Sequence, residues 1–301
     1  MGSPEFSVLP LEKLIKDDEI EVSLVVSQPD RRRNRNKYTP TPVKALAVEN
    51  NIDVITPENV NKEGVLEKIK SYDPDFIVVI AYGQIIKEGL LLQFDDRIIN
   101  IHASLLPKYR GAAPINWAII NGEEKTGVCS MLVEKGLDSG DVLDSLETEI
   151  KYEDDAISLE KRLSILASDL IVSTLKNYDS LYKKRIKQGD DFTLAPKLNK
   201  EMGHIDWEKN ASDIRNLVRG LKDWPATYSY FGDEKVKIHE VKELKVNSNV
   251  KPGTILCKKD KLVIKCGDNA IEILELQFPN KKKMDTKSYL LGNEIKVERV
   301  K

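Results

Sequence analysis

Asn100 and His102 are the first pair of residues in this sequence whose types and spacing suggest chemistry. They are two positions apart in the segment Ile98-Ile-Asn-Ile-His-Ala, so in an extended strand both side chains leave the same face. An amide and an imidazole side by side can donate two hydrogen bonds to one developing oxyanion. A buried histidine with a purely structural role is the alternative explanation, and for an isolated histidine it is the more frequent one.

A carboxylate that could act with this pair lies in a turn further along the chain. Asp138 stands between Gly136 and Gly140 in Gly-Leu-Asp-Ser-Gly-Asp. A carboxylate near His102 would stabilise the protonated imidazole and fix its orientation. Turn aspartates also commonly bond to their own backbone, and spacing alone does not choose between these two roles.

The elements that must position these residues resemble βα units of an open parallel sheet. In such a sheet, ligands bind at the carboxyl ends of the strands, and the strand with Asn100 and His102 breaks there into a Ser-Leu-Leu-Pro loop at 104–107. Proline in the first turn favours a helix opening at Thr41-Pro42, and a leucine stripe predicts another helix near 156–177. The buried strands expected from apolar, β-branched runs are 22–26, 52–55, 76–81 and 98–101.

The second half of the chain has a different pattern of apolar and polar residues. A polar, basic stretch with Gly189 and Pro196 indicates a linker. Beyond it, short strands separated by turn signals predict a small β-barrel, resembling an OB fold. We therefore expect a catalytic domain over 1–188, a linker over 189–204 and a β-barrel domain over 205–301. The strands expected in the barrel are 236–238, 253–256, 262–265 and 271–276.

Composition excludes several classes of protein. Apolar residues make up 41% and charged residues 32% of the 301 residues, which is typical of a globular chain. The longest apolar run, 76–81, is far shorter than the roughly 20 residues of a membrane span. Cys129, Cys257 and Cys266 are widely spaced and odd in number, so they indicate neither a disulfide framework nor a zinc site, and they fit a reducing cytosol. We expect a cytoplasmic protein that needs no metal.

A basic run stands out against the formal net charge of −2. It can be a plain solvated surface or a local site for the phosphates of a nucleic acid. Its five cations are Arg31, Arg32, Arg33, Arg35 and Lys37.

Taken together, the two polar segments resemble the signature of the folate-dependent formyltransferases. The matching residues are Asn-Ile-His-Ala-Ser-Leu-Leu-Pro at 100–107 and Gly-Leu-Asp-Ser-Gly-Asp at 136–141. The resemblance implies that Asn100, His102 and Asp138 form the catalytic set. It also implies that folate lies against two segments, which contain Ser104, Leu105, Leu106 and Pro107, and Tyr82, Gly83 and Gln84.

Further segments resemble the branch of this family that acts on tRNA. The resemblance implies formyl transfer from 10-formyltetrahydrofolate to the amino group of methionine on initiator tRNA, with the basic run against the tRNA, by a monomer. It also implies a strand before the segment that begins here at Met1, and glycines within the basic run, where this sequence has none. The matching segments are 1–8, 27–31, 109–115, 195–198, 204–207, 217–221, 224–226 and 275–277.

Three alternatives remain at this point. A relative that formylates a small amine, such as glycinamide ribonucleotide or an amino sugar, would share Asn100, His102 and Asp138, but would leave the basic run and the last hundred residues without a purpose. A nucleotide-binding oxidoreductase would need Gly-x-Gly-x-x-Gly after a strand, which this sequence lacks. An inactive tRNA-binding protein would not need the intact catalytic set.

Overall fold

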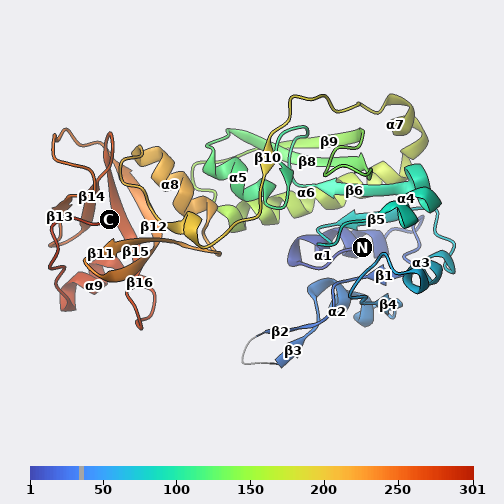
Figure 1. The fold of residues 1–301 in the computed structure, drawn as a ribbon, viewed down its shortest axis with the longest axis horizontal. Coiled ribbons are helices and arrows are strands. Elements are labelled where there is room, and N and C mark those ends of the chain that lie inside the picture. The colour runs from blue at the N-terminus through green and yellow to red at the C-terminus, as the bar shows by residue number, and fades with distance from the viewer. Residues whose placement is uncertain (34–36) are drawn as a thin grey trace. The chain divides into compact units, whose positions relative to one another are not determined.

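The computed structural model describes residues 1–33 and 37–301, and this part of the chain divides into two compact units (Figure 1). Each unit is built from more than one stretch of the chain, so the division differs from a simple cut at a linker. Unit 1 comprises Met1–Pro114, Lys125–Glu149 and Glu160–Ala195; unit 2 comprises Ile115–Glu124, Ile150–Leu159 and Pro196–Lys301.

The larger sheet of unit 1 has the order β5-β6-β8-β9 (Figure 1). Strands β5 and β6 are parallel, with Ile80 opposite Ile101, whereas β8 and β9 are antiparallel additions. The expectation of a parallel sheet is therefore wrong beyond β6. Strand β8 runs antiparallel to β6, and β9, which a loop joins to β8 without a crossover helix, runs antiparallel to β8. The strands are β5 (Ile77–Ile80), β6 (Ile98–His102), β8 (Lys125–Leu132) and β9 (Val142–Glu149).

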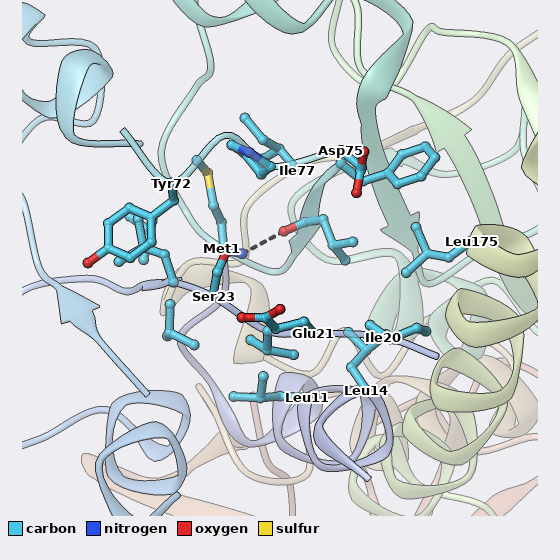
Figure 2. Close-up of a pocket in the computed structure, with 18 of the residues that line it drawn as sticks. Met1, Leu11, Leu14, Ile20, Glu21, Ser23, Tyr72, Asp75, Ile77 and Leu175 are labelled. Atoms are coloured by element: carbon cyan, nitrogen blue, oxygen red, sulfur yellow. Dashed lines mark hydrogen bonds between the residues drawn. The ribbon is translucent and has the colours of Figure 1, made fainter. Parts of the chain in front are cut away.

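A second, two-stranded parallel sheet pairs β1 (Val25–Val26) with β4 (Val54–Ile55), both shorter than expected. A cavity of about 520 Å³ separates it from β5, lined by 22–26 on one side and 74–78 on the other (Figure 2). Met1 and Gly2 close one end of this cavity. The amide of Gly2 donates to Val26 O at 3.0 Å, and the Met1 amino group donates to Val78 O at 2.5 Å. Burial lowers the pKa of this amino group to about 5.

Two helices match those expected from the sequence. Thr41 caps α2 by accepting a hydrogen bond from Lys44 N at 3.2 Å, with Pro42 in the first turn. Helix α6 matches the helix expected from its leucine stripe, and Leu163 and Leu170 on it are buried. Burying such a side chain stabilises the fold by roughly 1.5–3 kcal/mol. The helices are α1 (Val8–Ile15), α2 (Pro42–Glu49), α3 (Glu63–Lys70), α4 (Glu88–Phe94), α5 (Pro114–Ile120, shared with unit 2), α6 (Ala156–Lys176, also shared) and α7 (Tyr178–Lys184).

Two small pairings complete unit 1. Strands β2 (Arg31–Arg33) and β3 (Lys37–Thr39) form an antiparallel hairpin between β1 and α2 (Figure 1). Strands β7 (Arg110–Gly111) and β10 (Leu194–Ala195) are parallel. The second pairing ties the polar stretch after α7 to the loop that follows β6.

Unit 2 contains an antiparallel sheet of six strands, ordered β11-β12-β15-β14-β13, with β16 on β15. The expected strand 262–265 coincides with β14, and the strand expected at 236–238 lies in the first half of a longer β12. Trp207 packs in its core and donates to Ser229 Oγ at 2.9 Å. The elements are α8 (Ala211–Gly220), β11 (Thr227–Phe231), β12 (Glu234–Leu244), β13 (Ile255–Cys257), β14 (Leu262–Lys265), β15 (Ala270–Gln277), β16 (Met284–Asp285) and α9 (Thr286–Gly292).

Across the described ranges, 1–33 and 37–301, no helix combines the length and the apolar character that crossing a lipid bilayer requires.

Candidate active site

His102 ends strand β6 with both ring nitrogens facing acceptors. Its side chain is buried, with a residue exposure of 6%. Nε2 lies 2.8 Å from the backbone oxygen of Tyr109, and because a carbonyl can only accept, the proton on Nε2 donates to it. Nδ1 faces Asp138, with 3.6 Å between Nδ1 and Oδ2. This second contact is longer than a hydrogen bond, and such separations in a free enzyme can tighten when substrate binds.

The loop between β8 and β9 brings Asp138 to His102 from the far end of the strand. The loop starts beside the amino end of β6, where Val133 N donates to Ile98 O at 2.9 Å. Asp138 nevertheless reaches the histidine at the carboxyl end, so the loop crosses the sheet face on which His102 lies. Asp138 has a positive φ of 47°, which is strained for a residue other than glycine. Its Oδ2 accepts from Gly111 N at 2.9 Å.

Asn100 completes the expected set on the same strand. It lies opposite Val79 on β5 and Met131 on β8 and is half-buried. As it is two residues from His102, its side chain leaves the same face of β6. The structure therefore places Asp138 beside His102, on the face of β6 that Asn100 shares.

The loop after His102 contains the residues expected to contact folate. Ser104 is fully buried and donates through Oγ to Lys108 O at 2.6 Å, so its hydroxyl holds the loop closed. Leu105, Leu106 and Pro107 are half-buried. Leu106 N donates to the sulfur of Cys129 at 3.4 Å, which anchors this loop to β8.

The second expected folate segment follows β5, at the same sheet edge. Tyr82 is buried in the core at 2% exposure, and burial raises the pKa of its hydroxyl to about 12. Gly83 has a φ of 83°, a conformation that favours glycine. Gln84 accepts from Val60 N at 2.8 Å and donates to Pro57 O at 3.0 Å. Burial of Tyr82 and the two hydrogen bonds of Gln84 thus fix this segment at the edge of the sheet.

The basic run lies away from these residues in the chain, on the β2–β3 hairpin. Arg31 is exposed and its backbone pairs with Thr39. Arg35 lies outside the described residues, as do the side chains of Arg32, Arg33 and Lys37. At the base of the hairpin, Lys44 forms an ion pair with Asp30 at 2.7 Å.

Other chemistries have little support at this edge of the sheet. Cys129 lies opposite His102 on β8, but burial raises the pKa of its thiol to about 11, so the nucleophilic thiolate is scarce near neutral pH. Within the parts of the chain that the structure describes, no group of three or more His, Cys, Asp or Glu side chains is arranged to hold a metal ion.

Sequence patterns missed the residues that hold the histidine and the aspartate in place. The acceptor of the His102 proton is a backbone oxygen of Tyr109, and backbone groups carry no signature in the sequence. Tyr109 has a φ of 63° and Gly111 one of 127°. The Tyr-Arg-Gly sequence is the only local signal of this unusual backbone.

Comparison with known proteins identifies the family. The formyl transferase family matches residues 2–175, and the formyl transferase C-terminal domain matches 197–294. Solved structures with a similar fold include the N-formyltransferase from Helicobacter canadensis, with a TM-score of 0.64, 20% identity and coverage of 90% of this chain and 96% of that one. The sugar N-formyltransferase WlaRD has a TM-score of 0.63 at 22% identity, covering 93% and 97%.

Sequence relatives are closer. The methionyl-tRNA formyltransferase of Caldanaerobacter subterraneus is 45% identical, covering 98% of this chain and 96% of the relative. That of Clostridium novyi is 44% identical, covering 100% and 98%. With both domains matched and relatives this similar over nearly their whole length, the chain belongs to the formyl transferase family, among the methionyl-tRNA formyltransferases.

Proposed function

We propose that this protein transfers the formyl group of 10-formyltetrahydrofolate to the α-amino group of methionyl initiator tRNA, for the initiation of translation. The observation that carries the proposal is the approach of Asp138 to His102 on the sheet face that also holds Asn100. The names of the relatives support the substrate, since those at 44–45% identity over nearly the whole chain are methionyl-tRNA formyltransferases.

The reaction is an acyl transfer that needs charge stabilisation and one proton relay. The methionyl amine attacks the formyl carbon, and the carbonyl oxygen becomes an oxyanion in the tetrahedral intermediate. Asn100 and His102 donate hydrogen bonds to this oxyanion, each worth on the order of 3 kcal/mol in the transition state. Since the proton on Nε2 of His102 is bound by Tyr109 O, the hydrogen bond to the oxyanion uses a second proton on Nδ1, and Asp138 stabilises the imidazolium that has both protons.

Asp138 is the proposed acceptor of the proton that the reaction releases. It lies beside Nδ1 of His102, where it can orient the imidazole and accept the proton that the attacking nitrogen loses. The intermediate then collapses, the bond between the formyl carbon and N10 breaks, and the proton that Asp138 accepted passes to N10. The products are formylmethionyl-tRNA and tetrahydrofolate, with no covalent enzyme intermediate.

Folate binding is proposed at the carboxyl ends of β5 and β6. Because these strands are parallel neighbours, the segments that follow them lie at one edge of the sheet, where ligands of open α/β sheets bind. Leu105, Leu106 and Pro107 would contact the folate from one side, and Gly83 from the other. Ser104, Tyr82 and Gln84 would shape these segments from behind, through the contacts described above.

Binding of the tRNA is proposed at the β2–β3 hairpin, through Arg31, Arg32, Arg33, Arg35 and Lys37, and at the C-terminal domain. We further propose a catalytic domain over 1–188, a linker over 189–204 and an OB-like barrel over 205–301. The antiparallel sheet of unit 2 supports the last assignment. As Asn100, His102 and Asp138 all come from one chain, a monomer suffices, and translation places the enzyme in the cytoplasm.

A formylation assay tests the proposal. Purified protein is given 10-formyltetrahydrofolate and, separately, methionyl initiator tRNA, glycinamide ribonucleotide or an amino sugar nucleotide. We expect formylation of the methionyl-tRNA alone. Formylation of a small amine in preference to methionyl-tRNA would overturn the proposed substrate.

A further inference from the structure

Gln188 is the half-buried residue of an otherwise exposed stretch. All residues from Lys183 to Leu194 except Gln188 are exposed. This stretch runs past the catalytic set without contributing a residue to it. The hydrogen bonds of the Gln188 side chain explain why it is buried where its neighbours are exposed.

The amide of Gln188 makes three hydrogen bonds. Its Nε2 donates to Asp138 O at 3.0 Å and to Gly140 O at 2.7 Å. Its Oε1 accepts from Arg110 Nε at 2.9 Å. Only this orientation of the amide matches two acceptors on one side with a donor on the other. The side chain therefore holds the backbone of the turn that contains Asp138 by two hydrogen bonds.

Arg110 in turn holds Gln188 in place. Its buried guanidinium also donates to Gly189 O at 3.4 Å and lies over the ring of Phe192, 4.4 Å from the ring centroid. Backbone bonds attach the segment at both ends. Ile186 pairs with Val142 at the start of β9, and β10 pairs with β7.

The same segment also holds the partner of His102. Thr193 Oγ1 accepts from Tyr109 N at 2.8 Å, and Tyr109 O is the acceptor of the His102 proton. Both sides of the His102–Asp138 contact are thus attached to residues 186–195.

We propose that Gln188 is a positioning residue: by bonding to Asp138 O and Gly140 O, it holds the strained Asp138 turn so that the carboxylate faces His102. Asp138 keeps a positive φ, and such a conformation persists only where surrounding contacts impose it. Without the two donors of Gln188 the turn relaxes and the carboxylate moves away from Nδ1. A misplacement of about 1 Å can lower turnover by about 100-fold.

The test uses Gln188→Met, which removes all three hydrogen bonds, and Gln188→Glu, which keeps the acceptor for Arg110 but offers no donor to the two carbonyls. Gln93→Met, at an exposed position on α4, is the matched control. The inference rests on the proposed formylation of methionyl-tRNA. We expect kcat to fall 10- to 100-fold in both Gln188 variants, with KM for folate and for tRNA within about twofold of wild type.

A double-mutant cycle separates positioning from a general loss of structure. In an Asp138→Asn background, Gln188→Met should lower kcat by less than about twofold further, because the carboxylate that it positions is already gone. An undiminished loss in that background, or wild-type kcat in both Gln188 variants, would overturn the inference.

Nitrogen NMR of the His102 imidazole gives a readout that does not depend on turnover. The chain has three histidines, so the His102 signals are assigned by their loss in His102→Gln. In Gln188→Met we expect the Nδ1 signal to move toward its value in Asp138→Asn. An unchanged signal overturns the positioning role. A wild-type protein that does not formylate methionyl-tRNA overturns the proposed function instead, while this measurement still decides the role of Gln188.

Discussion

Nδ1 of His102 and Oδ2 of Asp138 lie 3.6 Å apart, although one residue ends β6 and the other lies in a loop that starts at the opposite end of that strand. The gap is too long for a hydrogen bond and short enough to close by a small movement. Because a small movement of Asp138 would open or close this contact, we expect activity to depend on both residues and on the contacts that hold the Asp138 turn.

Removing either oxyanion donor should lower turnover strongly. We expect Asn100→Ala or His102→Ala to reduce kcat by about 100-fold or more, because each takes away a hydrogen bond that strengthens in the transition state. Folate affinity, measured by fluorescence or calorimetry, should stay within about twofold. His204→Ala, in unit 2, is the control for loss of an imidazole. Wild-type turnover in folded His102→Ala would remove that residue from the mechanism.

Asp138→Asn should keep the fold and lose most activity. The amide can still accept the hydrogen bond from Gly111 N, but it can neither accept a proton nor stabilise an imidazolium. The control is Asp141→Asn in the same loop, which breaks only an ion pair with Arg185. If Asp138→Asn turned over at the wild-type rate from pH 6 to 9, the carboxylate would be a turn residue only.

Neutralising the basic hairpin should weaken tRNA binding without affecting folate. Replacing Arg31, Arg32, Arg33, Arg35 and Lys37 together should raise KM for methionyl-tRNA, since each cation that contacts a phosphate steepens the plot of log K against log salt by about 0.7 to 0.9. We expect Arg35→Ala to have the largest single effect, as the resemblance to the branch that acts on tRNA implies. Binding is measured at several salt concentrations.

The control for the hairpin is neutralisation of lysines elsewhere in unit 1. Lys62, Lys68 and Lys70 lie in or next to α3, and their replacement should leave the salt slope unchanged. Unaltered affinity and slope in the hairpin variant would assign tRNA recognition to the C-terminal domain.

Stability should rise with pH between about 5 and 8. Burial lowers the pKa of the Met1 amino group from 8.0 to about 5, so in this window the unfolded chain binds a proton that the folded chain does not. This lowering of the pKa corresponds to at most about 4 kcal/mol of stability, and the dependence should flatten below pH 5 and above pH 8. Denaturant unfolding at several pH values measures it, and acetylation of Met1 should abolish this component. An equally steep dependence in the acetylated protein would contradict the assignment.

An extended segment attached ahead of Met1 should stabilise unit 1. The cavity between 22–26 and 74–78 is flanked by β1 and β5 (Figure 2), and a strand of about five residues fits the length of either side at about 3.3 Å per residue. Five added Val and Ile residues should raise Tm by about 5 °C or more through burial of their side chains. A Gly-Ser extension of equal length is the control, and an equal Tm for the two extensions would argue against strand insertion.

The sequence by itself determined several of the elements and the candidate catalytic residues. Periodicity placed α6 and β14, and the two-residue spacing of Asn100 and His102 put both side chains on one face, since these features depend on local backbone geometry. The resemblance then singled out Asp138. Local geometry did not reveal that β8 runs antiparallel to β6 and β9 antiparallel to β8. These directions depend on the paths of the segments that connect the strands.

Only the tertiary structure decided how the site is held. The Asp138 turn crosses a sheet face to reach His102, the proton on Nε2 is bound by a backbone oxygen of Tyr109, and Gln188 bonds to two carbonyls. Backbone acceptors have the same chemistry at every position, so no residue type marks them in a sequence. In the sequence, Gln188 is one residue of a polar stretch typical of a linker, and only the fold shows that its amide bonds to the Asp138 turn.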